Sequence, residues 1–203
     1  MDTKQKILAA SRDLFNARGI PTTTLRQIAA ALQISQGNLN YHFKTKQDII
    51  ERLYFELVEK MDVEMANMTQ AFSLLSVLYQ SAEKTMALFY EYRFLLRDMY
   101  LIFRENDTVR DHYIQLQKTR KDQFNQLFES MIARGVLRGA EFPNEYERLY
   151  ERMSILGDHW INASDLFMAD QENPTAYFQD LLFEMVYPYL TEKGKVQYAA
   201  LHS

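Results

Sequence analysis

The chain contains no cysteine among its 203 residues. Disulfide bonds and thiol chemistry are therefore excluded, an absence that suits a reducing compartment. Glycine and proline are also scarce, with six and four copies, and residues 38–134 contain neither. Because these two residues interrupt regular structure, so long a stretch without them favours helices separated by capping residues.

A long hydrophobic run is also missing. The longest stretch without a charged residue, residues 65–82, carries several Asn, Gln, Ser and Thr side chains and makes a poor membrane span. The charged N-terminus runs directly into an amphipathic pattern, so a secretory signal peptide is not expected. We therefore expect a soluble, cytoplasmic protein without a membrane partner.

Patterns of catalytic and metal-binding residues are absent as well. The sequence has no His-Glu-x-x-His, no Gly-x-Ser-x-Gly, no phosphate loop and no dinucleotide fingerprint. A helical metal site needs Glu three residues before a His, but Val109 precedes His112 and Leu156 precedes His159 at that spacing. We therefore predict no enzyme activity, no cofactor and no metal.

Positive charge is scarce overall but gathers at one end. The formal net charge is −4, yet residues 1–47 hold seven Lys and Arg against two Asp, a net of +5, which leaves −9 for residues 48–203. A basic head on an acidic body is typical of a nucleic-acid contact limited to one end of the molecule. A chance fluctuation in a short segment is the alternative.

Residues 22–47 contain a series of helix signals. Thr24 followed by Gln27 fits a capping box, Ser35 is a good N-cap for a second helix, and Thr45 can cap a third. Two short helices joined by a tight turn, the second exposing polar groups, indicate a helix-turn-helix that reads DNA. The alternative is that these polar residues only solvate a short helix.

The second of these helices separates into a buried and an exposed face. Leu39 and Phe43, four residues apart, share the face that can be buried. Asn and Gln can pair with adenine edges, Tyr and His can reach phosphates or a thymine methyl, and Lys46 beside a helix N-terminus favours a phosphate. We predict that the DNA-contacting residues are Thr24, Arg26, Gln36, Gly37, Asn38, Asn40, Tyr41, His42, Lys44 and Lys46.

The first 50 or so residues resemble the DNA-binding domain of TetR-family transcriptional regulators. The resemblance rests on the run Ile-Leu-Ala-Ala-Ser-Arg-Asp-Leu-Phe at residues 7–15, then Gly19, the threonines before Leu25, Ile28-Ala29, Ser35-Gln36-Gly37 and Tyr41-His42-Phe43 leading into a lysine. The chain departs from the family at Asn40, where a Tyr that often contacts phosphate is usual. Asn40 can touch a base instead.

We expect an all-α fold of about nine helices. A three-helix helix-turn-helix DNA-binding domain is predicted at residues 1–47, followed by a larger helical effector-binding and dimerisation domain at residues 48–203. Helix breaks are expected near residues 69–70, 91–92 and 106–108. Gly135 is expected to end a helix, and Asn173-Pro174 to begin the last one.

Residues 48–203 hold 24 of the 27 aromatic residues. The resemblance implies an effector pocket between the middle helices, and walls rich in rings suit an apolar or aromatic small molecule. Arginines and a histidine there can pair with a carboxylate or phosphate of that molecule, although core rings and interhelix ion pairs are the ordinary alternatives. The residues predicted for the pocket are Phe89, Tyr92, Arg93, Arg97, Tyr100, Phe103, Tyr113, Phe128 and His159.

Two apolar stripes in the last third of the chain are wider than one monomer can easily bury. Related regulators pair two such helices with those of a second copy in a four-helix bundle, so the resemblance implies a homodimer. Packing within one chain is the alternative. The residues predicted for the interface are Tyr150, Met153, Trp160, Phe167, Phe178, Leu181, Leu182 and Met185.

Together these features predict a sequence-specific transcriptional regulator. The resemblance implies a homodimeric repressor that a small apolar or aromatic effector releases from a palindromic DNA operator. Two other functions remain open: a helical protein-interaction module, and a ligand-blind DNA-binding protein without effector control.

Overall fold

The structure, a computed structural model, describes residues 2–67, 73–168 and 173–201. Within these residues the chain forms eleven α-helices and one short 3₁₀ helix, and its only β-type pairing is an isolated bridge between Leu137 and Leu190. The predicted all-α fold is therefore confirmed. In chain order the helices are α1 (Thr3–Arg18), α2 (Leu25–Ala31), α3 (Gln36–His42), α4 (Lys46–Asn67), α5 (Leu74–Glu91), α6 (Arg93–Arg97), α7 (Met99–Glu105), α8 (Asp107–Ala133), α9 (Glu145–Phe167), α10 (Thr175–Glu184), the 3₁₀ helix (Tyr187–Tyr189) and α11 (Glu192–Leu201).

The chain folds into two compact units. The first comprises residues 1–61 and 91–113, and the second comprises residues 62–90 and 114–203. Helices α4, α5 and α8 each begin in one unit and end in the other. The first unit extends beyond the head predicted at residues 1–47 because α6, far along the chain, packs against α1.

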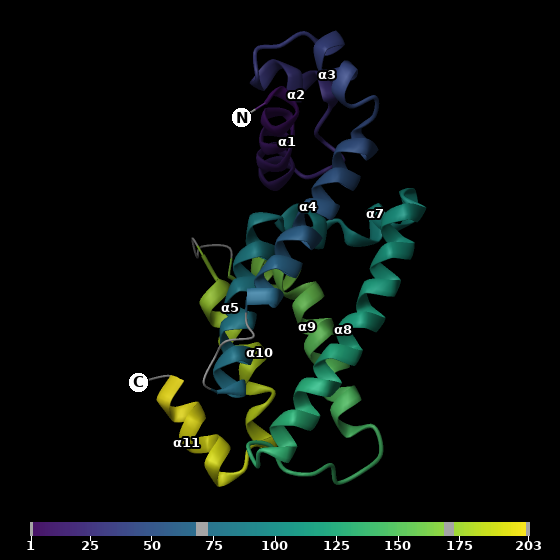
Figure 1. Cartoon of the computed structure of the whole chain (residues 1–203). Coiled ribbons are helices and arrows are strands. Elements are labelled where there is room, and N and C mark those ends of the chain that lie inside the picture. Colours follow the sequence, from purple (N-terminus) through teal and green to yellow (C-terminus); the bar gives the residue numbers. More distant parts are fainter. Residues whose placement is uncertain (1, 68–72, 169–172, 202–203) are drawn as a thin grey trace. The chain divides into compact units, whose positions relative to one another are not determined.

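The first unit is built on three helices that pack around a small apolar core. Helix α2 contacts both α1 and α3 (Figure 1). Phe15 of α1, Ile28 of α2 and Leu39 of α3 have no exposed surface. The ring of Phe94 from α6 lies 5.2 Å from that of Phe15, centroid to centroid, so the core of the head continues into α6.

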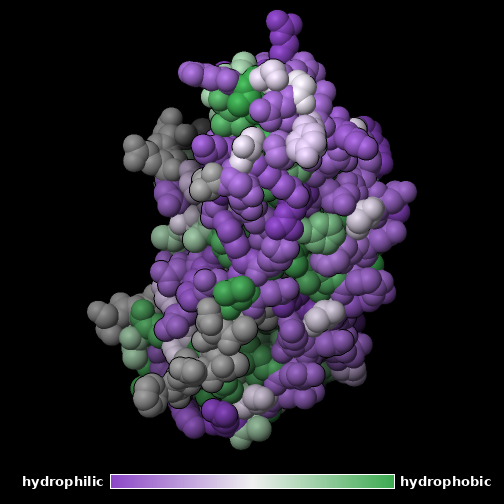
Figure 2. Space-filling model, turned by 45° about the horizontal axis from the view of Figure 1, so that its top comes forward, coloured by the Kyte–Doolittle hydropathy of each residue, from purple (hydrophilic) through white to green (hydrophobic). Residues whose placement is uncertain are grey.

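The second unit is held together by aromatic pairs between helices. Trp160 of α9 packs on Phe178 of α10 with ring centroids 5.1 Å apart, and Phe183 of α10 stacks on Tyr198 of α11 at 5.0 Å. A Cβ at Gly194 would lie 2.3 Å from the carbonyl oxygen of Val136. Glycine at this position therefore allows α11 to approach the main chain that follows α8. On the face drawn in Figure 2, hydrophilic side chains predominate and hydrophobic ones form small separate patches.

The helix breaks agree with the sequence in part. The expected breaks at residues 91–92 and 106–108 are confirmed, and Gly135, at φ +67°, follows the end of α8. The break expected at residues 69–70 lies outside the described residues. Two differences raise the number of helices above nine. The segment after Tyr92 divides at Asp98, whose carboxylate accepts a hydrogen bond from the Ile20 amide, and α11 follows α10, which was expected to be last.

Candidate nucleic-acid interface

Local capping defines both helices of the predicted helix-turn-helix. The Thr24 hydroxyl accepts a hydrogen bond from the Gln27 amide, and the Gln27 side chain accepts one from the Thr24 amide. At the start of α3, Ser35 accepts a hydrogen bond from the Asn38 amide at 3.1 Å. The predicted caps are confirmed, and they satisfy amides that would otherwise lack partners at the helix ends.

The turn between α2 and α3 requires an unusual backbone conformation. Gln33 has a φ of +56°, in the left-handed region that non-glycine residues seldom adopt. Hydrogen bonds on either side hold it there: the Gln33 amide donates to the Ala30 carbonyl and the Ile34 amide donates to the Ala29 carbonyl. The turn thereby changes the direction of the chain between α2 and α3 within four residues.

Helix α3 buries its two apolar residues and exposes its polar ones. Leu39 is fully buried and Phe43, just after the helix, is 5% exposed. Tyr41 is 85% exposed and its ring meets the His42 ring edge to face at 5.2 Å. His42 is half-buried. The other predicted DNA-contacting residues in and beside this helix are exposed, as Tyr41 is: Gln36, Gly37, Asn38, Asn40 and Lys44.

Two further predicted residues lie on the preceding helix. Arg26 in the first turn of α2 is exposed. Thr24 is exposed too, but its hydroxyl is engaged in the capping box, so its first role is to begin α2. A Cβ added at Gly37 would meet only the Ser35 hydroxyl oxygen, at 3.9 Å, so the fold itself does not require glycine there.

Lys46 has a role that the sequence did not predict. Its ammonium donates hydrogen bonds to the carbonyl oxygens of Ile20 at 2.7 Å and Thr23 at 3.1 Å, and the side chain is half-buried. The same ammonium therefore holds the loop between α1 and α2 against the start of α4, and its contact with a DNA phosphate stays a prediction. That start is capped by Thr45, whose hydroxyl accepts from the Asp48 amide, as predicted.

Lys4 is a candidate DNA contact that sequence reasoning missed. It is exposed, and its ammonium lies 5.7 Å from the centroid of the Phe43 ring, at the end of α3. This places a cation from the first turn of α1 beside the exposed helix. The only sign of it in the sequence was the positive charge of residues 1–47, because no local pattern joins residues 4 and 43.

The residues predicted for an effector pocket belong to both compact units. In the first unit, Tyr92 is fully buried, Phe103 and Tyr113 pair with ring centroids 4.8 Å apart, and Arg97 donates to the Asn16 carbonyl at 3.1 Å. Arg93 is half-buried, whereas Tyr100 is 81% exposed. In the second unit, Phe89 is half-buried, Phe128 is buried and His159 is exposed. The pocket remains a prediction.

Most residues predicted for a dimer interface are core residues of the second unit. The side chains buried within the chain itself are Tyr150, Met153, Trp160, Phe178 and Leu182. Within the chain, Trp160 packs on Phe178 of α10, whereas Tyr150 packs on Phe124 of α8. Leu181 and Met185 are half-buried, and Phe167 is 79% exposed. Of the predicted set, these three remain accessible to a second copy.

Residues 2–67, 73–168 and 173–201 contain no group of three His, Asp or Glu side chains placed to hold a metal ion. Among the helices described, none combines the length and hydropathy needed to cross a membrane.

A capped pair of short helices, the second exposing Asn, Gln, Tyr and Lys side chains above two buried apolar residues, defines a helix-turn-helix DNA-binding protein. A family model described as bacterial regulatory proteins, tetR family, matches residues 7–53, and a second, described as bacterial transcriptional repressor, matches residues 56–198. The chain belongs to the TetR family of DNA-binding transcriptional regulators, and proteins of this family are not enzymes.

Individual relatives agree with this assignment. The chain is 24% identical to the HTH-type transcriptional regulator HbdR of Aromatoleum sp. over 98% of its own length and 85% of that protein. It is also 24% identical to the HTH-type transcriptional regulator QacR of Staphylococcus aureus over 64% of its own length and 70% of that protein. The crystal structure of a TetR-family regulator from Marinobacter aquaeolei VT8 superposes with a TM-score of 0.87, at 24% identity, covering 99% of this chain and 97% of the other.

Proposed function

We propose that this regulator is a homodimeric repressor that binds a palindromic operator through α3 and is released from it by a small apolar or aromatic effector, in the cytoplasm. The observation that carries the proposal is the division of α3 into a buried apolar side and an exposed side with Asn38, Asn40 and Tyr41. Asn side chains discriminate bases by bidentate hydrogen bonds in the major groove, and this helix is short enough to enter it.

Charge supports the same surface. Arg26, Lys44 and Lys4 are exposed around α2 and α3, and residues 1–47 carry a net charge of +5 in a chain of net charge −4. Contacts of this kind to phosphates fix the position of a protein on DNA and supply affinity that falls as salt rises. The acidic remainder of the chain favours contact through this end alone.

The proposed dimer surface is the outward side of α9 with the neighbouring side of α10. Ile155, Leu166 and Phe167 of α9 are 63%, 72% and 79% exposed, and Tyr177 of α10 is 54% exposed. Ile155, His159, Asn162 and Leu166 follow one another at helical spacing and are all exposed, so they share one side of α9. Two of these four residues, Ile155 and Leu166, are large apolar side chains exposed on the surface of the single chain, and large exposed apolar groups indicate a protein contact.

The proposed effector class rests on the composition of the second unit. Its rings pair across helices, as Phe124 does with Tyr150 at 5.2 Å and Tyr90 with Trp160 at 6.4 Å. The indole N–H of Trp160 is buried and has no hydrogen-bond partner among the described residues. A molecule with an apolar or aromatic body suits such surroundings. Repression agrees with the description of the family model that matches residues 56–198.

The test is selection of bound duplexes from a random DNA pool by the purified full-length protein. The proposal predicts enrichment of a palindrome with one fixed half-site spacing, bound by two chains. Failure to enrich any sequence, with the protein folded and dimeric, would contradict sequence-specific binding by the free protein. Once the operator is known, a panel of aromatic and aliphatic small molecules can be screened for release of the DNA. A panel in which only highly polar molecules release it would contradict the proposed effector class.

A further inference from the structure

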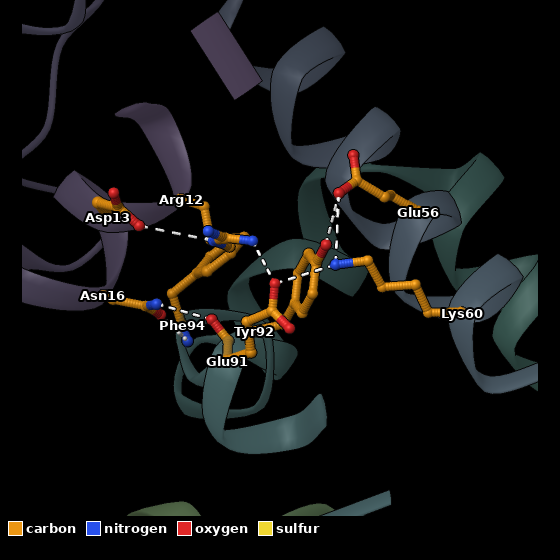
Figure 3. A network of polar contacts seen from close by, with 8 residues as sticks. All are labelled: Arg12, Asp13, Asn16, Glu56, Lys60, Glu91, Tyr92 and Phe94. Atoms are coloured by element: carbon orange, nitrogen blue, oxygen red, sulfur yellow. Dashed lines mark hydrogen bonds and ion pairs between the residues drawn. The ribbon is translucent and has the colours of Figure 1, made fainter. Parts of the chain in front are cut away.

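The segment that joins α5 to α6 is attached to α1 by a buried amide. The side chain of Asn16 donates to the Glu91 carbonyl at 2.8 Å and accepts from the Phe94 amide at 3.1 Å (Figure 3). Helix α6 has no capping side chain of its own, so Asn16 supplies from α1 a partner that a helix start requires. Asn16 is 9% exposed. This attachment uses the main chain of Glu91 and leaves its carboxylate free for other partners.

The carboxylate of Glu91 joins two helices that the sequence keeps far apart. It accepts hydrogen bonds from the Arg12 guanidinium of α1 and, at 2.9 Å, from the Lys60 ammonium of α4 (Figure 3). Both cations also lie against the Tyr92 ring, 5.4 Å from its centroid for Arg12 and 4.8 Å for Lys60. The Tyr92 hydroxyl donates to Glu56 of α4 at 2.6 Å. The Glu91 carboxylate therefore pairs with one cation from each of two helices.

The contacts of Asn16 and Glu91 act on α1, on which the position of α3 depends. Helix α1 packs on α2, and α2 packs on α3, so the orientation of α1 determines where the exposed side of α3 points. Helix α4 continues into the second unit, and Glu91 is the last residue of α5, whose other residues belong to that unit. Arg12 also lies 3.5 Å from Asp13 of its own helix, and Lys60 lies 3.8 Å from Glu56 of its own helix. The Glu91 carboxylate differs from these two in that it pairs with both cations.

We propose that Glu91 is a positioning residue that fixes the orientation of α3 relative to α4, and thereby the half-site spacing that the dimer accepts on DNA. The proposal rests on the function proposed above. Asn16 acts as the attachment point, and the Glu91 carboxylate, shared between Arg12 and Lys60, prevents rotation about it. A purely structural ion pair would change stability and leave both orientation and spacing as they are.

Three variants separate these roles. Glu91→Gln removes the charge but keeps the carbonyl bonded to Asn16, so the attachment of α6 survives. Lys60→Met removes the ammonium that pairs with Glu91 from α4 and leaves the ion pair between Arg12 and Glu91 intact. The matched control is Glu59→Gln, because Glu59 also forms an ion pair, with Arg52 at 2.9 Å, but both partners lie on α4.

The first measurement is the distance between α1 and the start of α8 in solution. Because the chain contains no cysteine, spin labels can be attached at Lys6→Cys and Thr108→Cys, both exposed positions of the first unit. Labelled protein is mixed with excess unlabelled protein, so that distances within one chain dominate. We expect a single narrow distance distribution in the parent and in Glu59→Gln, and a broader one in Glu91→Gln and Lys60→Met. A distribution that stays narrow in both variants overturns the proposal whether or not an operator is found.

The second measurement is the spacing preference on the selected operator and on duplexes with one base pair added to or removed from its centre. The discrimination is the ratio of the affinity for the selected operator to the affinity for a duplex of altered spacing. We expect Glu91→Gln to lower this ratio about two- to fivefold, because a partly exposed ion pair contributes a free energy of that size. Preference within each half-site should be unchanged, and the double variant with Lys60→Met should lose no more than Glu91→Gln alone. Unchanged spacing discrimination in folded Glu91→Gln contradicts the inference, whereas a parent that selects no palindrome contradicts the proposed function. Should Glu91→Gln fail to fold, Lys60→Met decides in both measurements.

Discussion

The ammonium of Lys46 donates a hydrogen bond at 2.7 Å to the carbonyl oxygen of Ile20, and so joins the first turn of α4 to the loop that follows α1. A second hydrogen bond from the same ammonium, to the Thr23 carbonyl oxygen, also holds that loop to α4. A charged donor that satisfies two carbonyls in a half-buried position contributes more to stability than an exposed phosphate-binding lysine would.

Lys46→Ala should therefore lower the free energy of unfolding by about 1–2 kcal/mol, because two charge-assisted hydrogen bonds are lost. The salt dependence of DNA binding should keep its slope. The matched variant is Lys44→Ala, whose side chain is exposed. It should leave stability unchanged and flatten the slope of log K against log salt by about 0.9 for one lost phosphate contact. A flattened slope with unchanged stability in Lys46→Ala would show that its ammonium leaves the carbonyls to bind a phosphate.

Asn40→Ala tests base reading by α3. Asn40 is exposed in the middle of this helix, so its removal leaves the core untouched, and alanine favours a helix more than asparagine does. We expect discrimination at one base pair of each half-site to fall by about 1–3 kcal/mol. Binding of a panel of single-base operator variants measures the change. If all variants keep their relative affinities, Asn40 does not read a base.

The helix-turn-helix could be predicted because its defining interactions are local. The caps by Thr24 and Ser35 each act on an amide three residues away, so the chain itself displays the pattern. The hydrogen bond from Lys46 to Ile20 joins residues 26 positions apart, and the one from Asn16 to Glu91 joins residues 75 positions apart. No periodicity marks such partners, and Asn16 had no feature that distinguished it from a solvated helix residue.

The apolar stripe of α9 shows a second limit of sequence reasoning. Helical spacing places Trp160 and Met153 in one apolar stripe, and the structure buries both within the chain. It does not reveal whether the covering surface comes from the same chain or from another. The covering helix for Trp160 is α10, through Phe178, and the exposed apolar residues lie on another side of α9. The buried members of the predicted interface are thus core residues of their own chain, and the position of the interface stays a prediction.

Acid should weaken the second unit through Glu145. Two hydrogen bonds from the Arg138 guanidinium, at 2.6 and 3.0 Å, lower the pKa of this carboxyl below its ordinary value, against the opposing effect of burial. A carboxyl with a lowered pKa in the folded state stabilises the protein fully above its unfolded pKa, about 4.3, and loses that contribution as the pH falls through the folded value.

Glu145→Gln should accordingly lower the urea midpoint of unfolding at pH 7, and the gap to the parent should narrow as the pH falls below about 4.3. The control is Glu141→Gln, because Glu141 lies 3.4 Å from the same guanidinium but is exposed. It should show a small gap at every pH. Urea titrations from pH 7 to pH 3 measure both variants, and a gap for Glu145→Gln that is constant with pH would refute the assignment.

The outward side of α9 provides the test of the dimer. If the proposed homodimer forms through this side, Leu166→Glu should convert it into a monomer at micromolar concentration. A carboxylate buried in that contact would lose its hydration, at a cost of about 2 kcal/mol or more in the association free energy. Val196→Glu is a matched control, since Val196 of α11 is 72% exposed, the same fraction as Leu166. Sedimentation velocity measures the mass of each variant, and circular dichroism verifies that both are folded. Dissociation by Val196→Glu alone would place the interface on α11, and dissociation by both changes would mean that α11 contributes to it as well. A dimer that tolerates Leu166→Glu would exclude this side of α9.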